Sequence, residues 1–299
     1  MRPKLLDLFC CEGGASVGYS RAGFDVYGVD LFRHRGADGK LRGYRQQRYP
    51  FASLKGNVVD VMELLLAGET LEFTNPDGTR EWLRLSDFAA ITASPPCQLY
   101  SISANAHHNS DHPDLVAVTR DLLIRARLPY IMENVEGAPL LGPLMLCGSM
   151  FHMRAHDTDG LEVWLKRHRL FESDAFLIPP GLCRHPKDIL CAGVYGNGAP
   201  SRDAAKARAG GYTPPSQGVR NALMGIDWMS RNGLSQSIPP AYTEWLGAQL
   251  LAHIESERTD WLTARFHDSG CGNCGRYIDP GDEVMRTPEG DYRCEECVA

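Results

Sequence analysis

Short apolar runs alternate with amphipathic stretches through the first half of the chain. Residues 4–9 (KLLDLF) predict a strand, which is followed by a glycine-bearing turn and a helix over about residues 16–22. A second apolar run, residues 24–29, leads to Asp30. A strand, a glycine turn, a helix and a strand that ends on an acidic residue are typical of the opening of a Rossmann-like sheet, which binds a nucleoside cofactor.

The same alternation continues along the chain and predicts a doubly wound α/β sheet. The expected elements are a helix at residues 57–69, a β-hairpin at 70–85, a strand at 88–92, a helix at 114–127, a strand at 129–132 and a last amphipathic helix at 240–253. Two prolines end the strand at 88–92, and a polar loop at residues 99–112 follows them.

Composition divides the chain into parts. Residues 174–233 are rich in Gly, Pro, Arg and Ala and lose helical periodicity, so we expect a small irregular region there. The α/β domain then takes residues 1–173 and is completed by residues 234–255. Residues 256–270 are expected to be a linker to a cysteine-bearing tail at 271–299.

Charge is distributed unevenly along the 299 residues. The totals are 31 Lys+Arg and 37 Asp+Glu, and residues 255–299 hold 5 of the basic and 11 of the acidic side chains. The rest of the chain is balanced at 26 against 26, but residues 164–220 carry 9 basic and 4 acidic side chains. A polyanion would be attracted to that segment and repelled by the tail. The sequence has no long apolar run and no apolar leader, so we expect a cytoplasmic protein without a membrane span.

Four of the ten cysteines form two pairs in the tail, Cys271-x2-Cys274 and Cys294-x2-Cys297. Two such pairs separated by 19 residues are typical of a structural zinc site with four thiolate ligands, which leave no open position for catalysis. The tail resembles a small zinc ribbon, and the metal would supply its folding energy. Its acidity favours a protein partner, or a simple cap, over a contact with DNA phosphates. The other six cysteines have no framework spacing and are expected to be reduced thiols.

Two motifs place reactive groups after predicted strands. In SPPCQ, two prolines fix the backbone and would present the thiol of Cys97, whose thiolate is an effective carbon nucleophile. A buried, unreactive cysteine is the alternative. In ENV, Glu133 could deliver a proton or hydrogen-bond a ring nitrogen, although a capping or ion-pairing glutamate is the simpler interpretation.

A basic stretch, residues 165–171 (LKRHRLF), carries Arg167 and Arg169. These side chains could reach a base carbonyl or a phosphate, but the stretch is equally compatible with a basic edge strand. Three histidines of the polar loop are expected to be solvated rather than to bind a metal: His107, His108 and His112.

Together, the motifs resemble those of the cytosine-C5 DNA methyltransferase family. Their order is DLFxxxGG, PPCQ, ENV and RxR over roughly residues 4–254, and the runs ENVEGAPL, LCGSMF, HRLFES and IPPAYTE look closest to small variants that bacteriophages encode. The resemblance implies a class I methyltransferase fold in which residues 174–233 are the target recognition region. It also implies a monomeric, S-adenosylmethionine-dependent enzyme that modifies double-stranded DNA, as in restriction–modification, in a bacterial or phage-infected cell.

The resemblance implies a role for each reactive residue. Cys97 attacks C6 of a flipped-out cytosine, so that C5 can accept the methyl group. Glu133 pairs with N3 and the exocyclic amine, Arg169 contacts the base O2, and Arg167 takes the second arginine position. Loss of the C5 proton and elimination of Cys97 then release 5-methylcytosine.

The resemblance also implies a cofactor site, in which Asp30 would hold the ribose hydroxyls and Phe9 would stack on the adenine. The positions that match the site are Phe9, Gly13, Gly14, Asp30, Asn57, Pro96, Gln98 and Ser237.

Four positions depart from the family pattern. Cys11 replaces a Gly of the first motif, and Asn57 replaces the Asp that bonds the adenine amine. Leu165 replaces the Gln that opens the arginine motif, and Gln236 replaces an Asn.

Two other functions stay open. The same scaffold could methylate tRNA or transfer a modified sulfonium substituent, and the departures at Cys11, Asn57 and Leu165 bear on this alternative. The chain could also be a catalytically inactive DNA-binding relative, against which the intact nucleophile, glutamate and arginines argue.

Overall fold

The computed structural model describes residues 2–35, 40–96, 100, 114–195, 202, 211–259, 261–263, 270–286, 292–294 and 297. The chain forms two compact units, the body (Met1–Leu250) and the tail unit (Leu251–Ala299). None of the described helices is both long and apolar enough to cross a bilayer.

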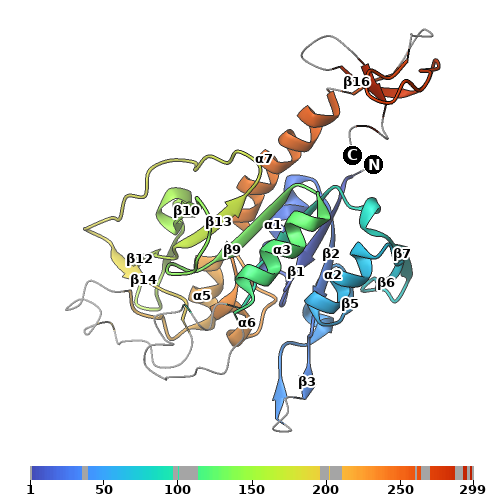
Figure 1. The fold of residues 1–299 in the computed structure, drawn as a ribbon. Coiled ribbons are helices and arrows are strands. Elements are labelled where there is room, and N and C mark those ends of the chain that lie inside the picture. The colour runs from blue at the N-terminus through green and yellow to red at the C-terminus, as the bar shows by residue number, and fades with distance from the viewer. Residues whose placement is uncertain are drawn as a thin grey trace. The chain divides into compact units, whose positions relative to one another are not determined.

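Nine strands of the body form one sheet in the order β10-β13-β9-β8-β1-β2-β5-β6-β7 (Figure 1). Five central strands are parallel to one another: β1 (Lys4–Leu8), β2 (Asp25–Asp30), β5 (Ala52–Lys55), β8 (Ala90–Ala93) and β9 (Tyr130–Asn134). Four outer strands pair antiparallel: β6 (Leu71–Thr74), β7 (Arg80–Leu83), β10 (Leu144–Leu146) and β13 (Arg169–Ser173). Every residue of β8 and β9 is buried, which explains why neither strand alternates regularly between apolar and polar positions.

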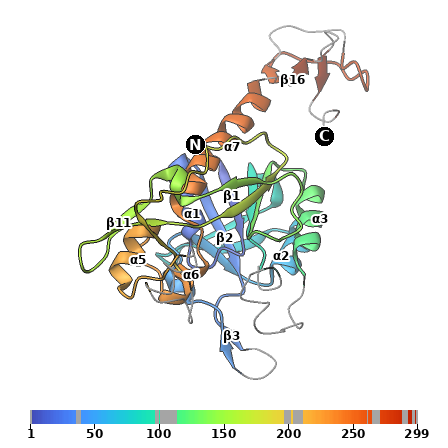
Figure 2. The ribbon, with the colours of Figure 1, turned by 90° about the vertical axis from the view of Figure 1, so that its left-hand side faces the viewer.

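Helices cover both faces of this sheet, as a doubly wound fold requires (Figure 2). One face carries α1 (Gly14–Ala22) and α7 (Pro240–Thr259), and the other carries α2 (Val58–Leu66) and α3 (Val116–Ala126). Contact between α1 and the start of α7 is close, because a Cβ added at Gly18 would lie 2.0 Å from Thr243 Oγ1. The predicted α/β class is confirmed.

A second, smaller core lies next to the sheet. It combines a three-stranded sheet of β11 (Arg154–His156), β12 (Glu162–Leu165) and β14 (Leu190–Ala192) with α5 (Gln217–Met224) and α6 (Arg231–Gln236). The region is thus less irregular than its composition indicates, and its sheet begins before residue 174. The basic stretch at residues 165–171, for which an edge strand was one of two interpretations, is not a single strand, since residues 166–168 separate β12 from β13.

The remaining elements are short. The body adds β3 (His34–Arg35) and β4 (Leu41–Arg42), with 3-10 turns η1 (Gln46–Arg48), η2 (Leu85–Asp87) and η4 (Gly148–Phe151). The tail unit contains a sheet of β15 (Trp261–Thr263), β16 (Glu283–Arg286) and β17 (Tyr292–Cys294). In the segment expected to be a linker, α7 therefore continues to Thr259 and β15 pairs with β16.

Candidate active site

One edge of the large sheet collects the described residues of the motifs to which the sequence assigns catalysis and cofactor binding. The parallel strands all end there, and β13 begins there because it runs antiparallel to β9, with Asn134 opposite Leu170. In Figure 1 the parallel strands end at the lower edge of the sheet. The segments at these strand ends are the turn at residues 9–14, Asp30, Asn57, residues 94–96, Glu133 and the Arg167–Arg169 turn.

The turn after β1 is unusually tight. Phe9, Cys11 and Gly13 all have positive φ, at 61°, 54° and 85°. A left-handed backbone favours glycine, so the Cys11 departure has a conformational cost. The Asp30 carboxylate offsets this cost, because its Oδ2 accepts the Cys11 N–H at 2.9 Å.

Glu12 of the same turn joins it to the second core, a role that the sequence did not indicate. The side chain is buried, and its Oε2 accepts the Ser230 N–H at 2.6 Å. Trp228 donates from Nε1 to the Glu12 carbonyl at 2.8 Å, and a Cβ added at Gly233 would lie 2.3 Å from Oε2. Only these long-range contacts identify the residue, and no local pattern marks it.

The residues around the turn fit an adenosyl cofactor. Helix α1 begins at Gly14, and no side chain caps its N-terminus, which is the end of a helix that favours a ligand's acceptor groups. A Cβ added at Gly14 would lie 1.8 Å from Ser237 Oγ, so glycine is required where the predicted Ser237 packs on the turn. Asp30 ends β2 beside them, and burial raises the pKa of its carboxyl.

Asn57 and Phe9 lie at the same edge but have structural partners of their own. Asn57 is the N-cap of α2, and its Oδ1 accepts the Val59 N–H at 2.9 Å. The amide oxygen at the position where the family pattern has an Asp therefore already accepts one hydrogen bond within the protein. Phe9 is half-buried and packs on the main core.

Hydrogen bonds fix the segment before the expected nucleophile. The Ser94 N–H donates to Leu8 O at 3.1 Å, its hydroxyl donates to Phe9 O at 3.3 Å, and Asn134 Nδ2 donates to Pro95 O at 3.0 Å. These bonds tie the proline turn to the ends of β1 and β9. Pro96 is the last described residue of this segment, and Cys97, Gln98 and the three loop histidines lie outside the described residues.

Glu133 and Arg169 form a buried ion pair at the end of β9. The Arg169 Nε lies 2.9 Å from Glu133 Oε1, and the glutamate is 8% exposed. Burial raises the pKa of the Glu133 carboxyl, although the guanidinium groups of Arg169 and Arg167 oppose this. A carboxyl of this kind is suited to holding a proton against a ring nitrogen.

The two arginines differ in their surroundings. Arg167 is buried and donates to three backbone carbonyls, those of Ser237 at 2.9 Å, Val194 at 3.0 Å and Ser235 at 2.9 Å. Burial lowers the pKa of Arg167 to about 9. Its donors therefore hold the second core against the sheet edge, whereas Arg169 faces the carboxyl of Glu133.

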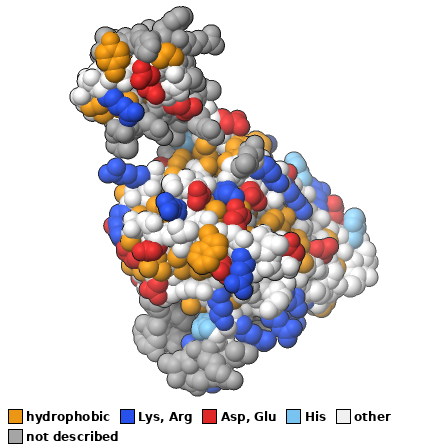
Figure 3. All heavy atoms as spheres, turned by 90° about the vertical axis from the view of Figure 1, so that its right-hand side faces the viewer, with side chains coloured by type: hydrophobic (Ala, Val, Ile, Leu, Met, Phe, Trp, Pro, Cys, Tyr) orange, Lys and Arg blue, Asp and Glu red, His pale blue; other side chains and the backbone are white. Residues whose placement is uncertain are grey.

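A basic hollow of about 340 Å³ lies at the same edge, beyond β2 and β5. It is lined by Phe32, Arg33, Arg45, Gln46, Gln47 and Lys55. On the face that carries β6 and β7, Lys and Arg side chains gather along the lower part of the body, whereas charged and hydrophobic side chains are mixed above (Figure 3). Positive charge thus accumulates on the side where the motifs meet.

In the tail unit, the four predicted ligands converge. The Sγ atoms of Cys271, Cys274, Cys294 and Cys297 lie within 4.8 Å of one another. The Cys294 N–H donates to Cys271 Sγ at 3.3 Å, and backbone N–H groups of Cys294 and Cys274 lower the pKa of Cys271 to about 6. Thiolates at this spacing fit a tetrahedral zinc ion.

A second group of possible ligands, which no sequence spacing connects, converges in the body. It consists of Cys147, His168, Cys183 and His185.

No family model matches the chain, and no curated protein matches it. Among solved structures, it is similar to a candidate DNA modification methyltransferase encoded within an E. coli prophage, at 14% identity and a TM-score of 0.43 over 85% of this chain and 99% of that chain. It is also similar to the S. pombe Dnmt2 methyltransferase, at 10% identity and a TM-score of 0.45 over 85% and 99%, and to a Spodoptera frugiperda DNMT2 mutant, at 12% and 0.41 over 83% and 99%. The geometry of the site, and not these similarities, therefore supports any assignment of chemistry.

Proposed function

We propose that the chain is an S-adenosylmethionine-dependent methyltransferase that acts on C5 of a flipped-out cytosine in double-stranded DNA. The observation that carries the proposal is the convergence, on one sheet edge, of the proline turn before Cys97, the Glu133–Arg169 pair and the glycine turn. Each group has a step to perform in this chemistry, and the inactive-relative alternative gives none of them a reason to meet.

In the proposed reaction, the Cys97 thiolate adds to C6 of the cytosine, and the electrons of the C5–C6 double bond move to make C5 nucleophilic. Protonated Glu133 bonds N3 and lowers the cost of this addition, while Arg169 donates to O2. The bound cofactor supplies the methyl group. Loss of the C5 proton to a base then restores the double bond and expels Cys97.

Cofactor binding is assigned to the turn and the neighbouring strand ends. Gly14 and the N-terminus of α1 would meet the polar groups of the methionine portion, with Ser237 packed beside them. Asp30 would accept from the ribose hydroxyls while it also holds Cys11 in place. Gln98 and Pro96 would flank the nucleophile.

The distribution of charge favours DNA as the substrate. Residues 164–220 carry a net +5, from 9 basic and 4 acidic side chains, and include strands of the second core, which would be the target recognition region. The tail cluster is proposed to bind one structural zinc ion and, with its acidic surface, a protein partner. The enzyme is proposed to act as a monomer in a bacterial or phage-infected cytoplasm, as in restriction–modification.

Covalent trapping tests the nucleophile. Duplex DNA that carries 5-fluorocytosine should form a stable adduct with the protein in the presence of cofactor, because fluorine at C5 blocks elimination. Cys97→Ala should form no adduct and should transfer no methyl group, whereas Cys191→Ala should behave like the unaltered protein. Turnover by Cys97→Ala would refute the mechanism.

The substrate class needs a second measurement. Bisulfite mapping of DNA and tRNA incubated with the protein should find 5-methylcytosine in the DNA. Methylation confined to tRNA would overturn the DNA assignment and leave the chemistry intact.

A further inference from the structure

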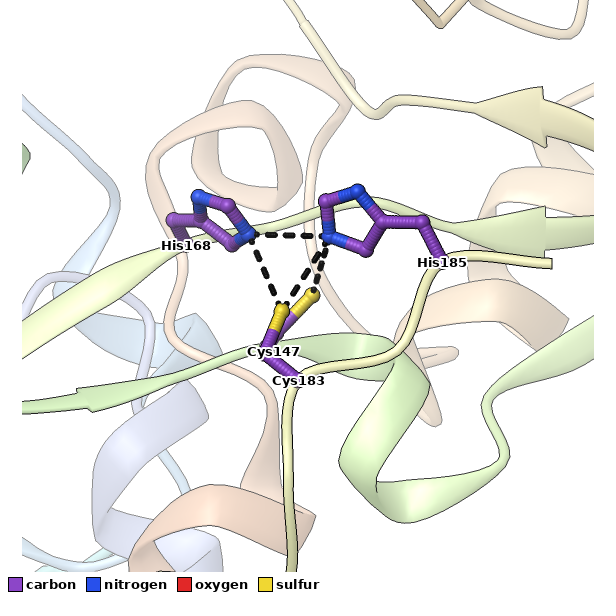
Figure 4. Close-up of side chains that lie close together, drawn as sticks. All are labelled: Cys147, His168, Cys183 and His185. Atoms are coloured by element: carbon purple, nitrogen blue, oxygen red, sulfur yellow. Dashed lines mark hydrogen bonds between the residues drawn. The ribbon is translucent and has the colours of Figure 1, made fainter. Parts of the chain in front are cut away.

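Four side chains converge where three separate segments of the body meet (Figure 4). Cys147 follows β10, His168 lies between β12 and β13, and Cys183 and His185 belong to the stretch between β13 and β14, which has neither helix nor strand among its described residues. The pairing of β10 with β13 places Leu146 opposite Arg169, so it brings Cys147 next to His168.

Their distances match the edges of a metal tetrahedron. The Nε2 atoms of His168 and His185 are 3.2 Å apart, and three nitrogen–sulfur distances are 3.2, 3.5 and 3.6 Å. Zinc bonds of about 2.05 Å to nitrogen and about 2.3 Å to sulfur give tetrahedral edges of about 3.3 Å for N–N and about 3.6 Å for N–S. The four ligand atoms all lie within 4.8 Å of one another.

Hydrogen bonds alone do not satisfy this arrangement. His185 Nε2 lies within 3.6 Å of His168 Nε2, Cys183 Sγ and Cys147 Sγ. A neutral imidazole nitrogen carries one hydrogen or one lone pair, so it can pair with only one of the three. A cation at the centre accepts a lone pair from every member.

The surroundings also resemble those of a metal centre. His168 Nδ1 lies 3.1 Å from Glu136 Oε1, a carboxylate contact that fixes the ring so that Nε2 is left for a metal. The His185 ring packs at 4.9 Å on the ring of Trp164, and Cys147 is buried. Of the four side chains, His185 is the exposed one.

We propose that Cys147, His168, Cys183 and His185 bind a structural zinc ion, the body zinc site, in addition to the ion proposed for the tail. Two thiolates and two imidazoles in a tetrahedron favour zinc, and four protein ligands leave no open position for catalysis. The ion would attach the stretch before β14 to the sheet. Because His168 lies between Arg167 and Arg169, the ion would also hold the turn that presents Arg169 to Glu133.

Metal content of the full-length protein tests the site. Elemental analysis should find two zinc ions per chain, and one in Cys183→Ser/His185→Ala. The tail variant Cys271→Ser/Cys274→Ser should also hold one, whereas the matched control Cys191→Ser/His156→Ala should hold two. The proposal would be overturned if the unaltered protein held one zinc ion and Cys183→Ser/His185→Ala kept it. A disulfide between Cys147 and Cys183, found by mass spectrometry, would overturn it as well.

Cobalt gives a readout in a protein whose body site is unaltered. In the tail variant, Co²⁺ should bind the body site with the visible spectrum of tetrahedral S₂N₂ coordination, and an octahedral spectrum would refute the site. His185→Cys should keep both zinc and turnover, while His185→Ala should lose the zinc and lower turnover. This last effect rests on the proposed methyltransferase function, but the zinc count and the spectrum do not. Two zinc ions in an inactive protein would therefore refute only the function.

Discussion

The body and the tail unit are stabilised in different ways. The body packs a continuous apolar core between the sheet and its helices, with Leu6, Val29 and Ile91 fully buried. In the described part of the tail unit beyond α7, the buried core residues are Cys271, Ile278, Val284 and Cys294. Half of these are proposed metal ligands. In the tail unit, the proposed metal ligands therefore form much of the core itself. In the body, the proposed metal ligands lie on a fold that apolar packing already stabilises.

The largest expected effect separates the two units directly. Cys271→Ser/Cys274→Ser should unfold the tail sheet, because a structural zinc site of this kind contributes about 10–16 kcal/mol of binding free energy. Hydrogen exchange should show loss of protection at residues 270–286 and unchanged protection in β1 and β8. Protection of the tail in a metal-free protein would contradict the comparison.

The same contrast explains what could be predicted from the sequence. The tail ligands are recognisable because the two cysteines of each CxxC pair are close in sequence. In the first pair the Gly275 N–H donates to Cys271 O at 2.8 Å and closes a local turn. The body cluster depends on the register of β10 and β13, which no spacing of Cys147 and His168 reveals. Likewise, the parallel strands were predictable as apolar runs, but α5 and α6 were not, because they are short and their stability depends on the second core.

Substitution of a proposed catalytic residue in the body should lower turnover. Glu133→Gln removes the proton that the proposed chemistry needs, so turnover should fall by about 10²–10⁴-fold with cofactor affinity unchanged. The matched control, Glu63→Gln, changes an exposed glutamate paired with Arg125 and should keep full turnover. Turnover of Glu133→Gln near that of the unaltered protein would remove this residue from the mechanism.

The buried carboxyl of Asp7, in β1, should lower the stability of the body once it ionises. The side chain is buried and bonded by the Ser16 hydroxyl, and burial raises its pKa from 3.8 to about 7. The folded state therefore prefers the neutral acid, and this stability is lost as pH rises from about 4 to about 7. Asp7→Asn should gain about 2–3 kcal/mol over the unaltered protein between pH 5 and pH 8. Denaturant unfolding at both pH values measures the difference, and a constant difference would contradict the raised pKa.

Asp30 joins the cofactor site to the geometry of the turn. Asp30→Ala should weaken S-adenosylmethionine binding by about 1.5–3 kcal/mol, the range for hydrogen bonds to a charged group. Asp25→Ala is the matched control, since Asp25 begins the same strand at its opposite end. Calorimetry should find that Asp25→Ala binds S-adenosylmethionine with unaltered affinity. Equal affinity in both variants would place the ribose elsewhere.

The smallest expected effect tests whether the tail opposes DNA binding by charge alone. Removal of residues 260–299 takes away 9 acidic and 4 basic side chains, a net −5, and preserves the described length of α7. Non-specific DNA binding should then strengthen severalfold at about 0.05 M salt. The gain should disappear at about 0.2 M salt, where the screening length falls to roughly 7 Å. Turnover should be unchanged, because the motifs for chemistry end by Ser237. Weaker binding at both salt concentrations would mean instead that the tail contacts the DNA, and that the two units share one function.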